Sequence, residues 1–95
     1  MKARTNDGRE VDLELYKFDS CPYCRKVQKV VDRLNVPVTM RDTMEDESAQ
    51  RRLLEVGGDD MVPCLFIDGK PMYESDDIVE YLEKNFLPAG PGKKR

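Results

Sequence analysis

Residues 13–34 read LELYKFDSCPYCRKVQKVVDRL. In the first part of this stretch, Leu13 and Leu15 alternate with polar residues, which is the two-residue period of a strand with one buried face. In the second part, apolar residues recur at i, i+3, i+4 and i+7, which predicts a helix over residues 22–34. A strand at about residues 11–18 is therefore followed closely by a helix, and the junction between them carries two cysteines.

The junction reads Cys21-Pro22-Tyr23-Cys24. Two cysteines at this spacing can close a small disulfide at a helix N-terminus, the pattern of a redox-active dithiol. The unpaired N–H groups and the positive end of the helix dipole stabilise a thiolate there, and Pro22 suits the first helical turn. We therefore expect Cys21 to be the attacking thiol and Cys24, one turn further in, to resolve the mixed disulfide. Two ordinary buried cysteines are the alternative interpretation.

The composition limits the class of protein. The chain has 95 residues, enough for one domain with a modest core, and its 39% apolar and 37% charged residues are ordinary for a globular chain. A net charge of −3 disfavours nucleic-acid binding, although Lys93-Lys94-Arg95 is locally basic. The longest apolar stretch, residues 61–67, contains a proline and is far shorter than the ~20 residues of a membrane-spanning helix. We expect no nucleic acid and no membrane among the partners.

The cysteine count indicates the compartment. Three cysteines, an odd number, fit one reactive pair in a reducing compartment better than a framework of structural disulfides, and residues 1–10 show no apolar signal segment. We therefore expect a cytoplasmic monomer. Without histidine, and with Cys64 as the one further cysteine, a zinc site built by a single chain is disfavoured. Cys64 begins an apolar run, which predicts a small buried side chain, with a regulatory thiol as the alternative.

The same periodicities predict the remaining elements. These are a strand at 36–41, a helix at 45–56 with Ala49, Leu53 and Val56 on one face, a strand at 64–67, an Asp68-Gly69 hairpin into a strand at 70–73, and a last helix that begins after Ser75. The order βαβαββα predicts an α/β domain with a four-stranded mixed sheet flanked by three helices. We expect this domain at residues 11–87, with a flexible lead-in at 1–10 and a disordered basic tail at 88–95.

Three motifs together resemble the glutaredoxin family. They are the Cys-Pro-Tyr-Cys dithiol, Val62-Pro63 before a strand, and the acidic, serine-containing start of the last helix, and the resemblance covers about residues 12–86. Residues 73–82, YESDDIVEYL, are also similar to the glutathione-site segment of glutathione-transferase N-terminal domains. The chain resembles the long, transferase-like bacterial glutaredoxins without their helical domain. The resemblance implies a thioredoxin-like fold and a glutathione-dependent thiol–disulfide oxidoreductase that acts on oxidised or glutathionylated proteins and needs no metal.

The resemblance also implies where glutathione would bind. In the family the proline that matches Pro63 is cis, and the backbone of Val62 would pair with the cysteinyl part of glutathione. The helix start would take the γ-glutamyl carboxylate on its free N–H groups, and an acid beside it would hold the ammonium group. Asp76 matches the glutaredoxin acid and Glu74-Ser75 matches the transferase pair, so the acid that serves the ammonium stays open. The predicted binding residues are Tyr23, Val62, Pro63, Glu74, Ser75 and Asp76.

A plainer interpretation of the last helix start exists beside this one. Ser75 is a preferred N-cap residue, and Asp76 and Asp77 would complement the helix dipole without any ligand.

One position departs from the glutaredoxin pattern. These proteins commonly have a lysine three residues before the first cysteine, whereas this chain has Phe18 there and Lys17 one residue earlier. An offset of one residue turns a strand side chain to the opposite face, so the usual contact with the glycyl carboxylate is in doubt. Lys17, Arg25 and Lys26 are candidates to help stabilise the Cys21 thiolate.

Two other functions stay open from the sequence. The departure at Phe18 leaves room for a redoxin that is reduced by thioredoxin reductase instead of glutathione. An iron–sulfur carrier, in which Cys21 and glutathione hold a cluster across a dimer, is the second rival, and Pro22 speaks against it by resemblance. Transferase activity of the usual kind is disfavoured, because the helical domain that binds the electrophile is missing from this sequence.

Overall fold

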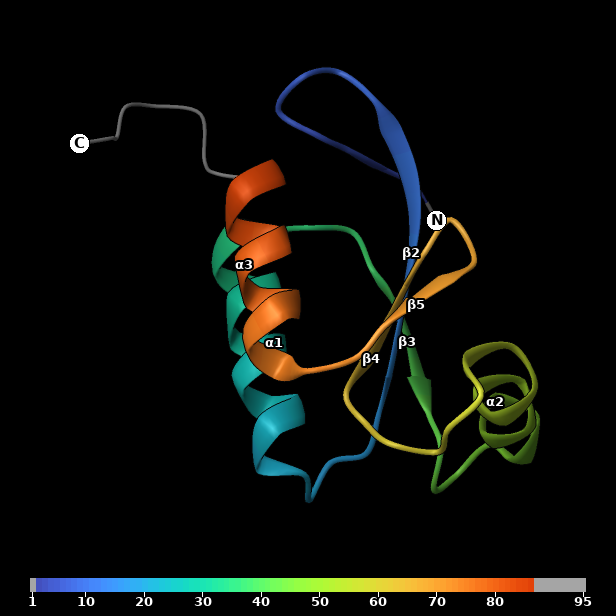
Figure 1. Cartoon of the computed structure of the whole chain (residues 1–95). Coiled ribbons are helices and arrows are strands. Elements are labelled where there is room, and N and C mark those ends of the chain that lie inside the picture. Colours follow the sequence, from blue (N-terminus) through green and yellow to red (C-terminus); the bar gives the residue numbers. More distant parts are fainter. Residues whose placement is uncertain (1, 87–95) are drawn as a thin grey trace.

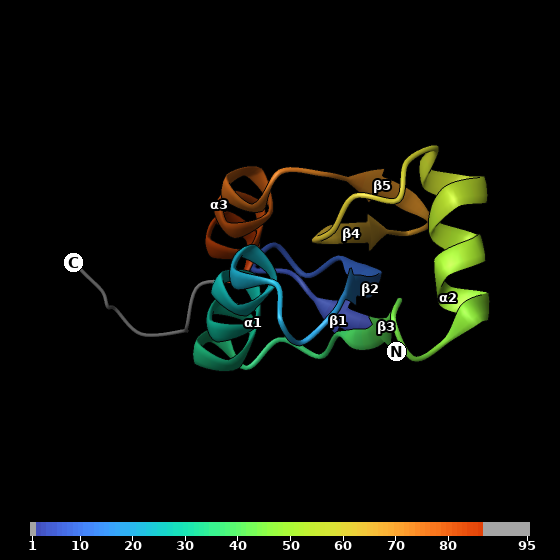
Figure 2. The ribbon, with the colours of Figure 1, turned by 90° about the horizontal axis from the view of Figure 1, so that it is seen from below.

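The computed structural model describes residues 2–86 and has the expected α/β architecture, with one sheet between two layers of helices (Figures 1 and 2). The predicted tail at 88–95 lies outside the described residues. The strands are β1 (Lys2–Arg4), β2 (Glu10–Lys17), β3 (Thr39–Asp42), β4 (Cys64–Ile67) and β5 (Lys70–Met72). The helices are α1 (Pro22–Leu34), α2 (Glu47–Arg52), which continues into a π-helical turn η1 (Leu53–Gly57), and α3 (Ser75–Asn85).

The strand β2 is the centre of the sheet. It pairs in parallel with β3, where Leu15 lies opposite Met40, and antiparallel with β4, where Leu15 lies opposite Leu65. The hairpin β4–β5 is antiparallel and turns at Asp68 and Gly69, whose φ angles of 52° and 83° are those of a tight hairpin turn. The parallel strand–helix–strand unit and the antiparallel hairpin expected from the sequence are therefore both confirmed.

A fifth strand is present that the sequence does not predict. Residues 1–10 are expected to be a lead-in, yet β1 pairs antiparallel with the first part of β2, with Ala3 opposite Val11. The element order is therefore ββαβαββα, and the sheet has five strands instead of four. The strand β1 has three residues with one buried side chain, Ala3, which is too short a pattern to show a period in the sequence.

Two predicted elements have different bounds. The strand expected at 36–41 begins only at Thr39, and its Met40 side chain is 40% exposed. The helix expected at 45–56 begins at Glu47, because the Asp46 carboxylate accepts from the backbone N–H groups of Ser48 and Ala49 and caps it. The π-helical turn η1 widens the last turn, so Val56 no longer shares a face with Ala49 and Leu53, and it is 44% exposed.

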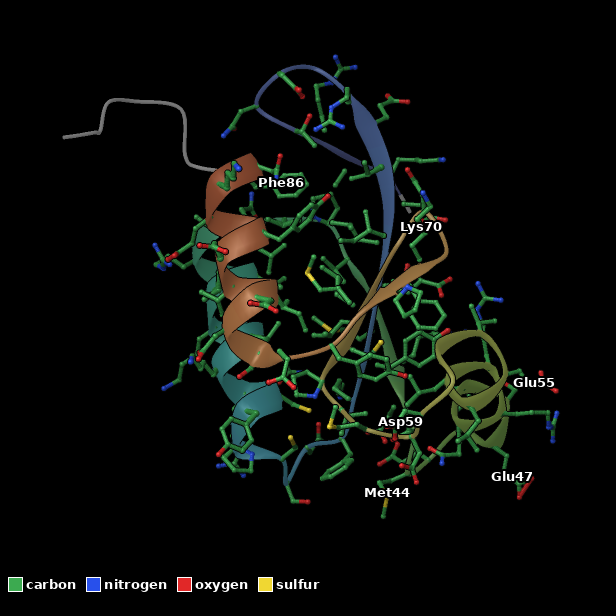
Figure 3. The ribbon with its side chains drawn as sticks, in the orientation of Figure 1. Met44, Glu47, Glu55, Asp59, Lys70 and Phe86 are labelled. Carbon is green, nitrogen blue, oxygen red and sulfur yellow. The ribbon has the colours of Figure 1, made fainter. Side chains whose placement is uncertain are left out.

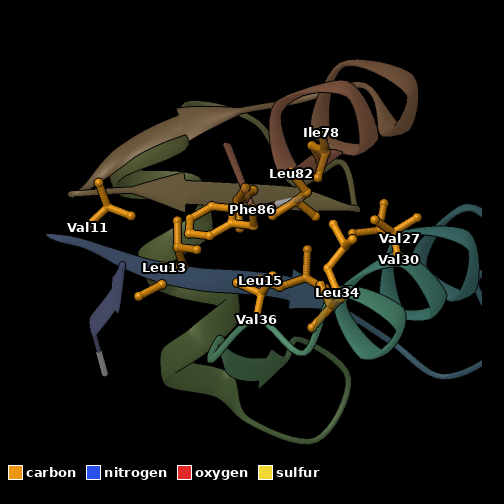
Figure 4. Close-up of a cluster of buried hydrophobic side chains, with 13 residues drawn as sticks. Val11, Leu13, Leu15, Val27, Val30, Leu34, Val36, Ile78, Leu82 and Phe86 are labelled. Atoms are coloured by element: carbon orange, nitrogen blue, oxygen red, sulfur yellow. The ribbon is translucent and has the colours of Figure 1, made fainter. Parts of the chain in front are cut away.

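The two faces of the sheet carry different cores. The helices α1 and α3 lie side by side on one face, where 13 buried side chains form an apolar cluster that includes Leu13, Leu15, Val27, Ile78 and Leu82 (Figure 4). Full burial of each large apolar side chain contributes about 1.5–3 kcal/mol, so this cluster supplies most of the apolar stabilisation. The face under α2 has a smaller cluster of Tyr16, Ala49, Leu53, Cys64 and Phe66.

Of the helices formed by residues 2–86, none combines the length and the apolar character needed to cross a membrane.

Candidate active site

Cys21 is the N-cap residue of α1. Its backbone is extended, with φ −82° and ψ 115°, and its Sγ accepts a hydrogen bond of 3.2 Å from the backbone N–H of Cys24. Pro22 occupies the first helical turn, as the sequence predicts. Cys21 is 5% exposed and Cys24 is fully buried, and both sulfurs are free thiols. The Cys21 sulfur at the helix start is thus the more accessible of the two. It accepts a hydrogen bond from a backbone N–H that has no partner within the helix.

The surroundings of Cys24 hold its thiol in the protonated form. Burial, together with the hydrogen bond to Cys21, raises the pKa of Cys24 to about 12. A raised thiol pKa means that the sulfur keeps its proton at neutral pH, so Cys24 is held in its unreactive form there. The Cys21 sulfur, in contrast, accepts a hydrogen bond from the backbone N–H of Cys24, and such a contact favours negative charge on the sulfur.

The basic residues near the dithiol have other partners. The Lys17 ammonium lies 2.9 Å from Asp19 and 3.6 Å from Asp42, and the hydrogen bond to Asp19 raises its pKa. The Arg25 Nε donates to the backbone carbonyl of Asp19, and Lys26 forms an ion pair with Asp76. The expectation that these cations stabilise the Cys21 thiolate is therefore not supported by their contacts.

A pocket of about 270 Å³ opens beside the dithiol. All six predicted binding residues line it: Tyr23, Val62, Pro63, Glu74, Ser75 and Asp76. Met61 lines it as well and was not among the predicted residues. Three segments that are far apart in the sequence therefore meet at one place: the start of α1, the turn before β4 and the start of α3. The position of Met61 directly before Val62 was the one signal that could have found it.

One wall of the pocket is the loop before β4. The Val62–Pro63 peptide bond is cis, as the family resemblance implies. The Tyr73 hydroxyl donates to the backbone carbonyl of Asp59 at 2.8 Å and so ties this loop to the end of the β4–β5 hairpin. Gly57 permits that contact, because a Cβ at this position would clash with the Tyr73 hydroxyl. The residue after Tyr73 begins the second wall, so one tyrosine joins both walls of the pocket.

The second wall is the start of α3, and here one expectation is wrong. Ser75 is the first residue of the helix, not its N-cap, which is Glu74. Glu74 has φ 72° and ψ 112°, a conformation that costs a non-glycine residue about 1–3 kcal/mol, and its side chain makes no capping hydrogen bond. The first N–H groups of α3 therefore face the pocket without a side-chain cap, which is the arrangement of an anion site.

Cys64 is separate from this pocket. It is fully buried under α2, and burial raises its pKa to about 11. The prediction of a small buried side chain is confirmed. A regulatory thiol would need exposure that Cys64 does not have.

One group of side chains has the spacing of a metal site. Oxygen atoms of Asp19, Asp42 and Glu45 lie within 4.8 Å of one another. The Lys17 ammonium contacts two of these carboxylates, Asp19 and Asp42, and an exposed acidic group with such a partner does not by itself indicate a metal site.

Comparison with known proteins connects this geometry to a family. Residues 15–90 match the family model described as glutathione S-transferase, N-terminal domain. The chain is 34% identical over 73 residues to glutaredoxin 2 of Escherichia coli, a match that covers 76% of this chain and 33% of that protein. It is 32% identical over 72 residues to glutaredoxin 1 of Rickettsia prowazekii, which covers 74% of this chain and 75% of the relative. The chain thus spans about a third of the length of the Escherichia coli relative and most of the Rickettsia one.

Solved structures agree with these relatives. The thioredoxin-like protein BC3987 superposes with a TM-score of 0.69 and 27% identity, over 77% of this chain and 97% of that protein. A buckwheat glutaredoxin–glutathione complex superposes with a TM-score of 0.62 and 27% identity, over 74% and 66% of the two chains. The fold and the dithiol site therefore define a thioredoxin-fold protein. The chain belongs to the glutaredoxin family, and it matches the related N-terminal domain of glutathione S-transferases over most of its length.

Proposed function

We propose that this protein is a glutathione-dependent thiol–disulfide oxidoreductase that reduces protein disulfides and glutathione mixed disulfides. The observation that carries the proposal is the pocket that joins the dithiol helix, the Val62–Pro63 turn and the uncapped start of α3. Its volume of about 270 Å³ suits a tripeptide that lies partly in solvent. The buckwheat glutaredoxin with a similar fold was solved as a complex with glutathione, which supports the choice of ligand.

Each part of glutathione has a complementary group in the pocket. The γ-glutamyl carboxylate would accept from the free N–H groups at the start of α3, where the positive end of the helix dipole favours an anion. The ammonium group beside it would pair with Asp76 or Glu74, which both line the pocket. The cysteinyl part would lie along the backbone of Val62 and bring its sulfur toward Cys21.

The proposed reaction is two successive thiol–disulfide exchanges. The Cys21 thiolate attacks the glutathione sulfur of a mixed disulfide, forms a Cys21–glutathione disulfide and releases the protein thiolate, which takes a proton from water. A second glutathione thiolate attacks the glutathione sulfur of that disulfide, restores the Cys21 thiolate and leaves as oxidised glutathione. For a protein disulfide, the Cys21 thiolate attacks one protein sulfur, forms a mixed disulfide with it and releases the other protein sulfur as a thiolate. Cys24 then gives its proton to solvent and attacks Cys21 Sγ, which breaks the bond to the protein and releases the second protein thiolate. Two glutathiones reduce the resulting Cys21–Cys24 disulfide and leave as oxidised glutathione.

One observation favours a second candidate. Phe18 stands where glutaredoxins commonly have a lysine. The neighbouring Lys17 does not take over that role, because its ammonium pairs with Asp19 and Asp42. Without that contact to the glycyl carboxylate, glutathione binds less tightly, and a flavoprotein thioredoxin reductase becomes the rival source of electrons. We propose a monomer in the cytoplasm, and the odd number of cysteines fits a reducing compartment.

The test is glutathione-dependent reduction of a small mixed disulfide, run beside coupling to thioredoxin reductase. We expect turnover with glutathione, and chemical-shift changes on glutathione titration at residues 21–24, 61–63 and 73–77. Turnover with the reductase alone, and no shift at saturating glutathione, would replace the proposed function with the rival. An absorption spectrum of freshly purified protein with visible bands would instead point to an iron–sulfur cluster.

A further inference from the structure

The mouth of the pocket has an exposed apolar edge. Tyr23 is 63% exposed and Met61 is 44% exposed, and both line the pocket from opposite segments, the start of α1 and the loop before β4. Single exposed apolar side chains are ordinary, but here two of them border the same pocket. Under the proposed function, they stand beside the reacting sulfur and are available to the protein segment attached to it.

The same edge carries acids without a cationic partner. Asp59 and Asp60 are exposed and directly precede Met61, and Glu74 lines the pocket itself. Within residues 2–86, none of these three carboxylates takes part in an ion pair, whereas Asp76 is paired with Lys26. Lys70 lies at the other end of the sheet from Asp59 (Figure 3), so it does not neutralise this edge. Two exposed acids therefore directly precede the apolar Met61 on the β4 side of the pocket, and Glu74 adds a carboxylate on the α3 side.

We propose that this edge, formed by Tyr23, Met61, Asp59 and Asp60, docks protein segments in which the disulfide-bonded or glutathionylated cysteine is flanked by a basic and an apolar residue. The proposal rests on the proposed function and names its substrate class. The apolar neighbour of the cysteine covers Tyr23 and Met61, and the basic neighbour meets Asp59 and Asp60. A segment with acidic neighbours meets like charge at the same place and is disfavoured.

The expected size of the effect follows from the exposure of the acids. Ion pairs between exposed side chains contribute about 0.2–1 kcal/mol, which is roughly 1.4- to 5-fold in kcat/KM for each pair. Asp59 and Asp60 together should therefore make kcat/KM for a basic peptide about 10-fold higher than for an acidic peptide at low salt. Because exposed charges are screened, the preference should shrink at about 0.5 M salt.

The experiment compares two glutathionylated peptides that differ only in the residues beside the cysteine, lysines in one and glutamates in the other. A small neutral glutathione mixed disulfide is the reference substrate. We expect the unmodified protein to prefer the lysine peptide, and the double variant Asp59→Asn with Asp60→Asn to lower the preference by about 3-fold or more. The control is Asp32→Asn, which removes one negative charge on α1, ten residues or about 15 Å beyond Pro22, and its effect is compared with that of each single variant, Asp59→Asn or Asp60→Asn.

Three outcomes separate the possibilities. Turnover of the reference substrate without a preference between the peptides overturns the docking proposal and leaves the proposed function intact. Absence of turnover on all three substrates overturns the proposed function itself. If replacing Lys93, Lys94 and Arg95 by glutamine alters the preference as much as replacing the two acids, the basic end of this chain is the occupant of the acidic edge, and the proposal is wrong.

Discussion

Two helices begin at the candidate site, and their first turns are built in opposite ways. The start of α1 is closed by its own sulfur, since Cys21 Sγ accepts the N–H of Cys24. The start of α3 has no side-chain cap, because Glu74 stands at the N-cap with a φ of 72° and makes no capping hydrogen bond. Both ends present the positive pole of a helix dipole to the same region. One pole therefore acts on an atom of the protein, and the other is available to a ligand.

Under the proposed function, the difference gives chemistry and binding to separate helices. At α1 the dipole and the N–H group would stabilise negative charge on the Cys21 sulfur, which is part of the chain. At α3 they would stabilise negative charge on glutathione, which binds and leaves. A change at one helix start should therefore leave the function of the other largely intact, and the following predictions test that separation.

The largest effect is expected at the sulfur that caps α1. Cys21→Ser should abolish all disulfide exchange, since a serine hydroxyl is not ionised at neutral pH and cannot form a disulfide. It should also abolish labelling by iodoacetamide at neutral pH, because burial holds the pKa of Cys24 at about 12 and that of Cys64 at about 11, and both thiols keep their protons. Mass spectrometry of the labelled protein measures this directly.

The control for that variant is Cys64→Ala, which removes a cysteine that lies under α2 and outside the pocket. It should keep disulfide exchange. Labelling of Cys24 or Cys64 ahead of Cys21 in the unmodified protein would show that the nucleophile has been assigned to the wrong sulfur.

The second prediction separates the two sulfurs of α1. Cys24→Ser should lose reduction of protein disulfides and keep most of the reduction of glutathione mixed disulfides. Free glutathione can resolve the Cys21–glutathione disulfide by itself, whereas a trapped protein needs the neighbouring sulfur. Parallel assays with a protein disulfide and a small mixed disulfide measure the two activities, and an equal loss of both would contradict this division of roles.

The contrast between the two helix starts also shows what the sequence could predict. The start of α1 was predictable, because the valine periodicity, Pro22 and the cysteine spacing are all local signals. The start of α3 was only partly predictable. The sequence pattern locates the helix, but it favours Ser75 as the N-cap residue, whereas Glu74 is the N-cap in the structure. The backbone conformation of Glu74 depends on the position at which the β4–β5 hairpin ends relative to α3. This is a tertiary effect, and the local sequence carries no signal for it.

Other differences have separate origins. The short strand β1 pairs with residues 10–12 of β2, which β3 leaves unpaired, and its three residues carry no period of their own. Val56 turns away from the core because the π-helical turn shifts the register after Leu53. The pairing of Lys26 with Asp76 joins α1 to α3, and 50 residues of sequence separate the two partners. None of these features leaves a periodic signal in the sequence.

The third prediction concerns Asp76 on the ligand side. Asp76→Ala should raise the KM for glutathione by about 5-fold, corresponding to roughly 1 kcal/mol for one exposed, charged hydrogen bond. A larger effect is not expected, since the Asp76 side chain is 83% exposed and Lys26 already shares it. The alkylation rate of Cys21 should hardly change, because its thiolate depends on α1.

Lys26→Gln is the matched variant, since it breaks the same ion pair and keeps the acid. An unchanged KM in Asp76→Ala combined with a slower alkylation of Cys21 would show that the two helix starts are not independent. A KM change in Glu74→Gln alone would assign the glutathione ammonium to Glu74 instead.

The smallest effect is expected for Ser75, and it concerns stability. If Ser75 capped α3, Ser75→Ala would destabilise the protein as loss of a cap does; since Glu74 is the N-cap, we expect a change of less than about 0.5 kcal/mol in the free energy of unfolding. Asp46→Ala is the comparison, because the Asp46 carboxylate accepts from Ser48 and Ala49 at the start of α2, and its removal should lower the urea midpoint clearly. Urea unfolding of both variants, followed by circular dichroism, measures the difference. Equal destabilisation by the two substitutions would mean that Ser75 does cap α3, and that the N–H groups assigned to the ligand are already in use.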